Sequence, residues 1–271
     1  MFARFGRSWR LMKQSYGLLM KDKELLLLPV LSGICILVLV ASFVWPMVQN
    51  DFVWIEENPR MSALLGFAFY VLMYTIAFFF QAALIAGACE RMSGGDPTLG
   101  SALGAAAKRL PTLFAWGIVA GTVGMILNAI QERSEWVGRI VAGLLGAAWS
   151  IATFFVVPVL VMEKEPLGTS FKRSWGLVKD RWGEAVIGSG GIGLATMLVG
   201  IPIMLVCGAL VRGGMETAGI VVGVVAFGLL AVFGSALQGV YVATLYRYAT
   251  TNETPQGFGI ADIEGAFHAK A

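Results

Sequence analysis

The sequence predicts an all-α membrane protein with about six transmembrane helices, and three observations support this fold class. Of the 271 residues, 57% are hydrophobic and only 14% are charged, whereas soluble globular domains carry roughly 25% charged residues. The mean hydropathy is +0.75. Several apolar runs are long enough to cross a bilayer, because about 20 apolar residues span its hydrocarbon core as a helix.

We predict one transmembrane helix in each of six apolar segments. They cover residues 25–48, 62–88, 110–130, 137–162, 184–211 and 218–246. The first segment exceeds the roughly 7–15 apolar residues of a secretory signal peptide, so we interpret it as a membrane span. Pro158 and Pro202 are expected to bend the fourth and fifth spans, because proline lacks a backbone donor.

Basic residues are unevenly distributed among the segments that connect these spans. Of the 20 Lys and Arg residues, 16 lie in the N-terminal segment, the second and fourth connections and the C-terminal segment. The other side has only Arg60, Arg133, Arg139 and Arg212. The positive-inside rule therefore predicts that both termini are cytoplasmic. We expect the protein in the bacterial or archaeal cytoplasmic (inner) membrane.

A nine-residue motif occurs twice. Residues 5–13 read Phe-Gly-Arg-Ser-Trp-Arg-Leu-Met-Lys and residues 171–179 read Phe-Lys-Arg-Ser-Trp-Gly-Leu-Val-Lys, with six identities. Aromatic and aliphatic residues recur at helical spacing in both copies. This pattern predicts a cytoplasmic-side interfacial amphipathic helix, with an aromatic face at the acyl boundary and a basic face at anionic headgroups. A fainter copy at 99–113 lacks the aromatic residues.

The repeat organises a single integral membrane domain, 1–271. We divide it into candidate repeat units 1–90, 95–163 and 166–249, followed by a short cytoplasmic tail, 250–271. Each unit is predicted to hold one interfacial helix and one two-span hairpin, giving three hairpins in all. Under a simpler interpretation the interfacial helices only anchor the hairpins.

The motif copies supply the candidate contact residues for lipid or a partner. These are Arg7, Trp9, Lys13, Arg173, Trp175, Lys179 and Trp182. The predicted partners are membrane lipids with anionic headgroups and a second copy or another membrane protein, and no nucleic acid is expected. Small residues at four-residue spacing, such as Gly117 and Gly121, suit a homo-oligomer or packing within one chain. The run 21–24 is interpreted as a solvated turn. The alternatives are pairing with a neighbouring cytoplasmic segment and binding of a lipid headgroup or a partner.

Polar side chains are rare inside the predicted spans. Gln81 and Gln238 lie deepest, and they form either a candidate polar pathway or interhelical hydrogen bonds. No Asp, Glu, Lys or Arg lies mid-span, which argues against an ion-coupled pump. The single histidine, His268, and three separated cysteines predict no metal site, no cofactor and no catalytic residues.

The strings 8–13 and 21–29 resemble an uncharacterised family of bacterial and archaeal six-span integral membrane proteins. The resemblance extends over the chain through Ser174-Trp175 and the tail residues Pro255, Gly257 and Phe258. It implies a polytopic membrane fold and no known activity. More distantly, the Arg-Ser-Trp motif is similar to membrane domains fused to glycerophosphodiester phosphodiesterases, and the start of the chain is similar to sulfate-uptake proteins.

The sequence features bear on three classes of function. In the first, an accessory or organising protein acts through lipid or partner contacts at the cytoplasmic membrane surface, where the distinctive residues lie. In the second, a channel or transporter for a small solute or ion uses Gln81 and Gln238, as an oligomer. A membrane-embedded enzyme has little support, because the spans contain no paired carboxylates and no nucleophile beside a base.

Overall fold

The computed structural model describes residues 15–17, 19–20, 22–49, 57–133, 137–180 and 185–251. Within these ranges the regular structure is helical and no strand is assigned. The first motif copy, with Arg7, Trp9 and Lys13, lies outside the described residues, as do Trp182 and the chain from 252 onwards.

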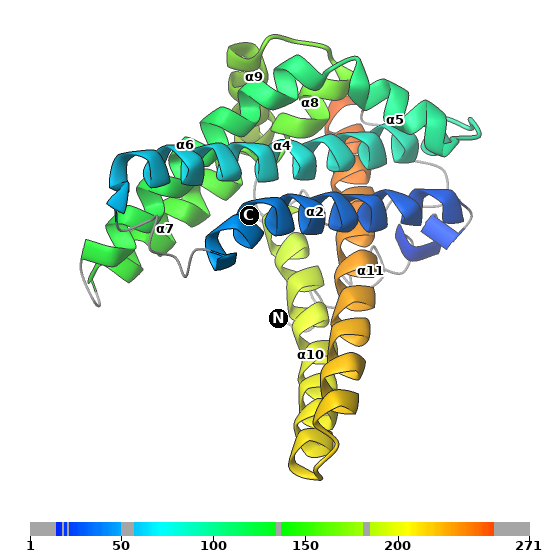
Figure 1. The fold of residues 1–271 in the computed structure, drawn as a ribbon. Helices are drawn as coiled ribbons and strands as arrows, with labels where there is room; N and C mark the ends of the chain where they lie inside the picture. The colour runs from blue at the N-terminus through cyan, green and yellow to red at the C-terminus, as the bar shows by residue number, and fades with distance from the viewer. Residues whose placement is uncertain are drawn as a thin grey trace. The chain divides into compact units, whose positions relative to one another are not determined.

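Ten helical elements follow one another in the described part of the chain (Figure 1). They are η1 (Lys23–Leu26), α2 (Leu27–Gln49), α4 (Pro59–Met92), α5 (Leu99–Ala107), α6 (Leu110–Arg133), α7 (Val137–Ala152), α8 (Val156–Met162), α9 (Leu167–Asp180), α10 (Ala185–Arg212) and α11 (Glu216–Thr251).

In the part of the chain that the structure describes, five helical segments are long and apolar enough to cross a membrane, which confirms the predicted membrane class. They are Lys23–Gln49, Pro59–Met92, Leu110–Glu132, Val137–Met162 and Glu216–Thr251. The remaining predicted span, 184–211, coincides with α10, which continues through Pro202 for 28 residues. The part of α10 with described side chains forms a shorter apolar helix, Thr196–Arg212.

The chain forms two compact units. The first contains Met1–Pro29, Gly87–Leu99 and Arg181–Ala271, and the second contains Val30–Ala86 and Gly100–Asp180. In the first unit α10 and α11 run side by side as a hairpin (Figure 1). These two units differ from the three predicted repeat units, and the division into repeat units stays a prediction.

A glycine turn and a glycine row shape the α10–α11 hairpin. Gly214 has φ +80°, and the N–H of Met215 donates to the Leu210 carbonyl at 3.0 Å, which is the Schellman end of a helix. Further along, a Cβ on Gly219 would lie 2.7 Å from Val211 Cγ2, and one on Gly223 would lie 3.4 Å from Cys207 Sγ. This stripe of small residues therefore serves packing within the chain.

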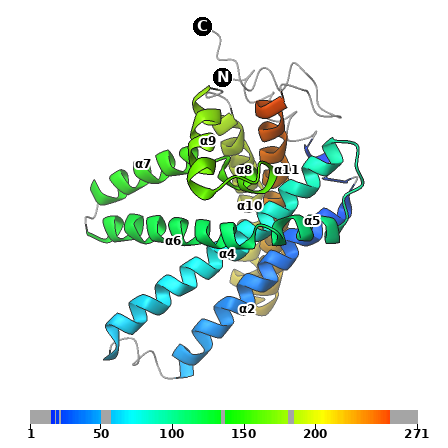
Figure 2. The same ribbon diagram turned by 90° about the horizontal axis from the view of Figure 1, so that it is seen from above.

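In the second unit α4 and α6 approach closely along another glycine row. A Cβ on Gly117 would overlap the Thr75 hydroxyl, and one on Gly121 would lie 3.3 Å from Val71 Cγ2. Farther along α6, Asn128 donates to the Tyr70 hydroxyl at 3.1 Å. Residue numbers fall on α4 as they rise on α6, so the two helices are antiparallel. Figure 2 shows α6 and α7 side by side in the same unit.

The predicted fourth span is interrupted, and its two helices α7 and α8 are separated by the joint Thr153–Phe155. Proline three residues beyond the joint explains the position, because the Pro158 ring cannot donate and clashes with the carbonyl four residues earlier. Across the joint, Phe154 N–H donates to Ile151 O at 3.3 Å and Val156 N–H to Thr153 O at 3.0 Å. These are three-residue steps, as in a 3₁₀-helix.

Candidate functional site

The joint leaves two backbone groups without their helical partners. In a continuous helix the Ala152 carbonyl would accept from Val156, and the Phe155 N–H would donate to Ile151. Both partners have shifted to three-residue bonds. Unpaired backbone groups are costly in the membrane interior, so irregular backbone occurs there only where other groups satisfy it.

Ser174 of α9 binds both of these groups. Its hydroxyl donates to the Ala152 carbonyl at 2.9 Å and accepts from the Phe155 N–H at 3.1 Å. The side chain is fully buried. The serine of the Arg-Ser-Trp motif thus has a structural task that the sequence analysis did not assign. Its presence in both motif copies was the available signal.

Two further contacts attach α9 to the same elements. The Phe171 ring stacks on Trp149 of α7 with centroids 6.1 Å apart, and Trp149 in turn stacks on Trp116 of α6 at 5.6 Å. At the end of α8, Arg173 forms an ion pair with Glu163 at 3.3 Å. Arg173, a predicted contact residue, is therefore already paired within the chain.

The two faces of α9 differ in exposure and chemistry. Its buried face contains Ser170, Ser174, Leu177 and Val178. Its outer face carries Lys172, Trp175 and Lys179 at steps of three and four residues, and all three are exposed. Trp175 is 50% exposed. We refer to these three residues as the outer row.

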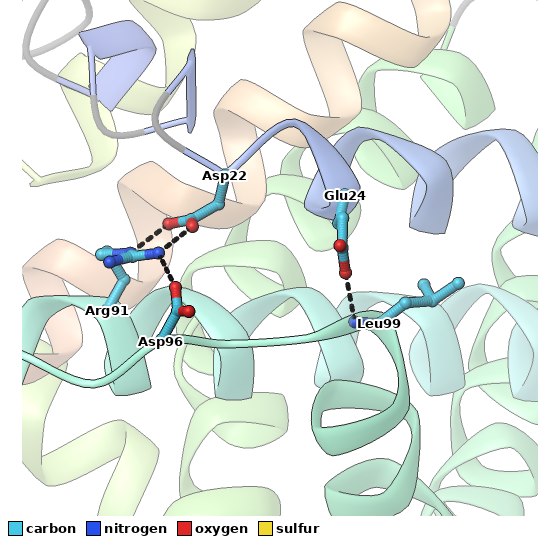
Figure 3. Close-up of polar contacts among 5 residues, drawn as sticks. All are labelled: Asp22, Glu24, Arg91, Asp96 and Leu99. Atoms are coloured by element: carbon cyan, nitrogen blue, oxygen red, sulfur yellow. Dashed lines mark hydrogen bonds and ion pairs between the residues drawn. The ribbon is translucent and has the colours of Figure 1, made fainter.

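A second polar cluster, at the end of α4, corrects the interpretation of 21–24 as a solvated turn. Asp22 is only 6% exposed, and Arg91 binds both of its carboxylate oxygens. Arg91 also contacts Asp96 at 2.5 Å. Figure 3 shows Asp22 and Asp96 converging on Arg91. This arrangement follows the alternative expectation, pairing with a neighbouring segment.

Three more hydrogen bonds hold the chain around this cluster. Glu24 accepts a hydrogen bond from the N–H of Leu99 at 3.1 Å (Figure 3). Leu99 is the first residue of α5, so the carboxylate satisfies an orphan donor at the helix N-terminus. Arg247 of α11 donates to the Cys89 carbonyl at 3.1 Å and also binds the Ser93 hydroxyl.

The two glutamines of the candidate polar pathway are each half-buried. Gln81 belongs to the second unit and Gln238 to the first. That the two glutamines line one polar pathway therefore stays a prediction. Among the residues that the structure describes, no three His, Cys, Asp or Glu side chains form a group that could hold a metal ion. The available chemistry at both polar clusters is charge pairing and hydrogen bonding.

Several membrane-length apolar helices define a multi-pass α-helical membrane protein. The chain belongs to a family of unknown function, DUF6159, whose model matches residues 61–258. No curated protein matches the chain. The expected membership in an uncharacterised family is thereby confirmed, whereas the likeness to phosphodiesterase-linked membrane domains remains a resemblance.

Proposed function

We propose that this protein is an accessory or organising protein of the bacterial or archaeal cytoplasmic membrane. It acts by binding anionic lipid headgroups at the cytoplasmic surface through α9 and the first motif copy. The observation that carries this proposal is the outer row, in which Trp175 lies between Lys172 and Lys179 on an exposed helix face. Tryptophan favours the membrane interface, and cations favour anionic headgroups.

The outer row suits lipid because its two kinds of group match two layers of the membrane surface. The Trp175 ring lies at the level of the headgroups, and the lysine stems extend along it to the phosphates. Each basic residue near an anionic surface contributes about 1 kcal/mol. Two lysines therefore favour anionic over zwitterionic lipid by roughly 2 kcal/mol, enough for selective enrichment.

The proposed topology has six spans in three hairpins, with α10 as the fifth span and both termini cytoplasmic. Its support is the charge asymmetry of 16 basic residues against four. In this topology α9 is an interfacial amphipathic helix on the cytoplasmic side, preceding the third hairpin. A second copy or another membrane protein is the further partner that we propose, binding at the same surface.

Replacing Trp175 with phenylalanine is expected to remove a distinct part of the fluorescence quenching by brominated lipid. The protein would be reconstituted with lipids brominated near the carbonyl end of the acyl chain, either phosphatidylglycerol or phosphatidylcholine. We expect the Trp175 contribution to be quenched more by the anionic lipid. Each of Lys172→Ala and Lys179→Ala should lower this preference about fivefold.

Two controls separate the outer row from general effects. Trp116→Phe removes a buried indole, so it should not change the lipid preference. Arg60→Ala removes an exposed cation on the other side of the proposed topology and should leave the preference intact. Equal quenching of Trp175 by both lipids would contradict the proposal. Solute flux in proteoliposomes that depends on Gln81 and Gln238 would favour a channel or transporter instead.

A further inference from the structure

Helix α9 carries both the outer row, which faces the lipid headgroups in the proposed function, and Ser174, which binds the interrupted backbone of the fourth span. Trp175 belongs to the outer row, and the adjacent Ser174 occupies the joint of the fourth span. Whatever displaces α9 must therefore also withdraw the hydroxyl from the joint. Insertion of a side chain into the helical ladder is a recognised cause of sharp helix bends.

We propose that Arg173 exchanges Glu163 for an anionic lipid headgroup, and that this exchange releases Ser174 so that α7 and α8 join into one continuous span. The inference rests on the proposed function, because it assigns a regulated event to the same lipid-binding helix. The lipid is defined by its chemistry, a phosphate-bearing headgroup in a bilayer.

The ion pair is suited to such an exchange. The Arg173 and Glu163 side chains are 47% and 26% exposed, with the closest nitrogen and oxygen 3.3 Å apart. Exposed pairs of this kind are weak, and a phosphate matches the guanidinium fork at least as well as a carboxylate does. The neighbouring outer row brings anionic headgroups to the same helix and raises their local concentration.

The joint has two arrangements that satisfy the same backbone groups. In the observed one, Ser174 binds Ala152 and Phe155. In the other, Val156 N–H returns to the Ala152 carbonyl and Phe155 N–H returns to Ile151, and the serine is no longer needed. The Pro158 ring determines where the helical hydrogen bonding is weak. Because proline has no N–H, the Phe154 carbonyl lacks a helical donor in either arrangement.

Release of α9 does not expose its buried apolar side chains to water. Leu177 and Val178 are buried in the docked helix, and the acyl boundary of the bilayer can receive them when α9 moves. The lipid therefore binds the released state of α9 more tightly than the docked state. Such a difference in affinity is the condition for shifting the equilibrium between the two states. The released Arg173 adds a further lipid contact.

The test is a distance measurement across the joint in nanodiscs. Spin labels on unnatural residues at Leu144 and Met162, both exposed, leave the native cysteines unchanged. Residues 18 apart lie on one face of a continuous helix, about 27 Å apart along its axis. In phosphatidylcholine we expect the distance between the two labels to differ from this value, because the joint interrupts the helix. In phosphatidylglycerol we expect a larger fraction of the molecules to show the distance of a continuous helix.

Two variants should mimic the lipid. Glu163→Gln removes the competing carboxylate and should raise the continuous population in phosphatidylcholine. Ser174→Ala should give the continuous distance in both lipids, whereas Ser174→Thr retains a hydroxyl and should restore the lipid response. Arg60→Ala, which removes an exposed cation on the other side of the proposed topology, is the surface control and should respond as the wild type does.

The outcomes separate this inference from the proposed function. If Trp175 reports preference for anionic lipid while the wild-type distance is the same in both lipids, the exchange is wrong and the proposed function stands. If Ser174→Ala keeps the broken-helix distance, Ser174 does not control the joint and the inference is overturned. If neither quenching nor distance responds to lipid charge, both proposals fail.

Discussion

Arg91→Met is expected to lower the unfolding free energy by about 3–5 kcal/mol, because it leaves the Asp22 carboxylate buried without its partner. The Asp22 side chain is 5% exposed, and Arg91 is 26% exposed. Both oxygens of the carboxylate are bound by the guanidinium. Equilibrium unfolding in mixed detergent and sodium dodecyl sulfate micelles, followed by far-ultraviolet circular dichroism, would measure the loss.

A double-mutant cycle separates this interaction from other effects of the substitution. Asp22→Leu in the Arg91→Met background removes the buried charge, so the double variant should be clearly more stable than the Arg91→Met single variant. Arg173→Met is the matched control, because its pair with Glu163 is more exposed and should cost only about 0–1 kcal/mol. Similar losses for Arg91→Met and Arg173→Met would refute the buried-pair assignment.

The membrane class and most helix positions could be predicted because they depend on local composition. Predicted segments 25–48 and 62–88 correspond to α2 and α4, whose observed bounds extend to Gln49 and Met92. A long apolar run in a bilayer has to satisfy its own backbone donors, so helix is the available structure. Hydropathy alone therefore carries this information.

The polar clusters could not be predicted in the same way, because they depend on residues far apart in sequence. Arg91 and Asp22 are 69 positions apart. Without knowledge of this partner, the charged run 21–24 is indistinguishable from a solvated turn. For the interruption of the fourth span, Pro158 was the one indication in the sequence. That Ser174 satisfies the joint depends on how α9 folds back over α7 and α8, which no local pattern encodes.

The small-residue stripes illustrate a prediction with two open outcomes. Spacing alone suits contact with a second copy or contact within one chain. In the structure Gly117 and Gly121 lie against α4, and Gly219 and Gly223 lie against α10. These four positions therefore give no support to an oligomer, and the proposed second copy has to bind elsewhere.

Gly117→Val is expected to destabilise the protein by about 3 kcal/mol through the α4–α6 contact. Even a Cβ at this position would overlap the Thr75 hydroxyl and lie 3.2 Å from the Val71 carbonyl oxygen. A rotamer change can move the Thr75 hydroxyl, but the next two nearest atoms, the Val71 carbonyl oxygen and the Thr75 nitrogen, are backbone and cannot move in this way. Membrane helices associate through close packing rather than hydrophobic expulsion, so a forced separation is not offset by burial of the added methyl groups.

Gly143→Ala provides the contrasting substitution, because a Cβ there meets nothing within 4 Å. Replacing this α7 glycine should be neutral or stabilising by up to about 1 kcal/mol, since alanine favours helix. Thr75→Ala combined with Gly117→Ala should recover only part of the loss, because it removes the hydroxyl overlap and leaves the Val71 carbonyl in place. The same unfolding titration measures all three variants, and equal stability of Gly117→Val and Gly143→Ala would mean that α4 and α6 do not approach at this glycine.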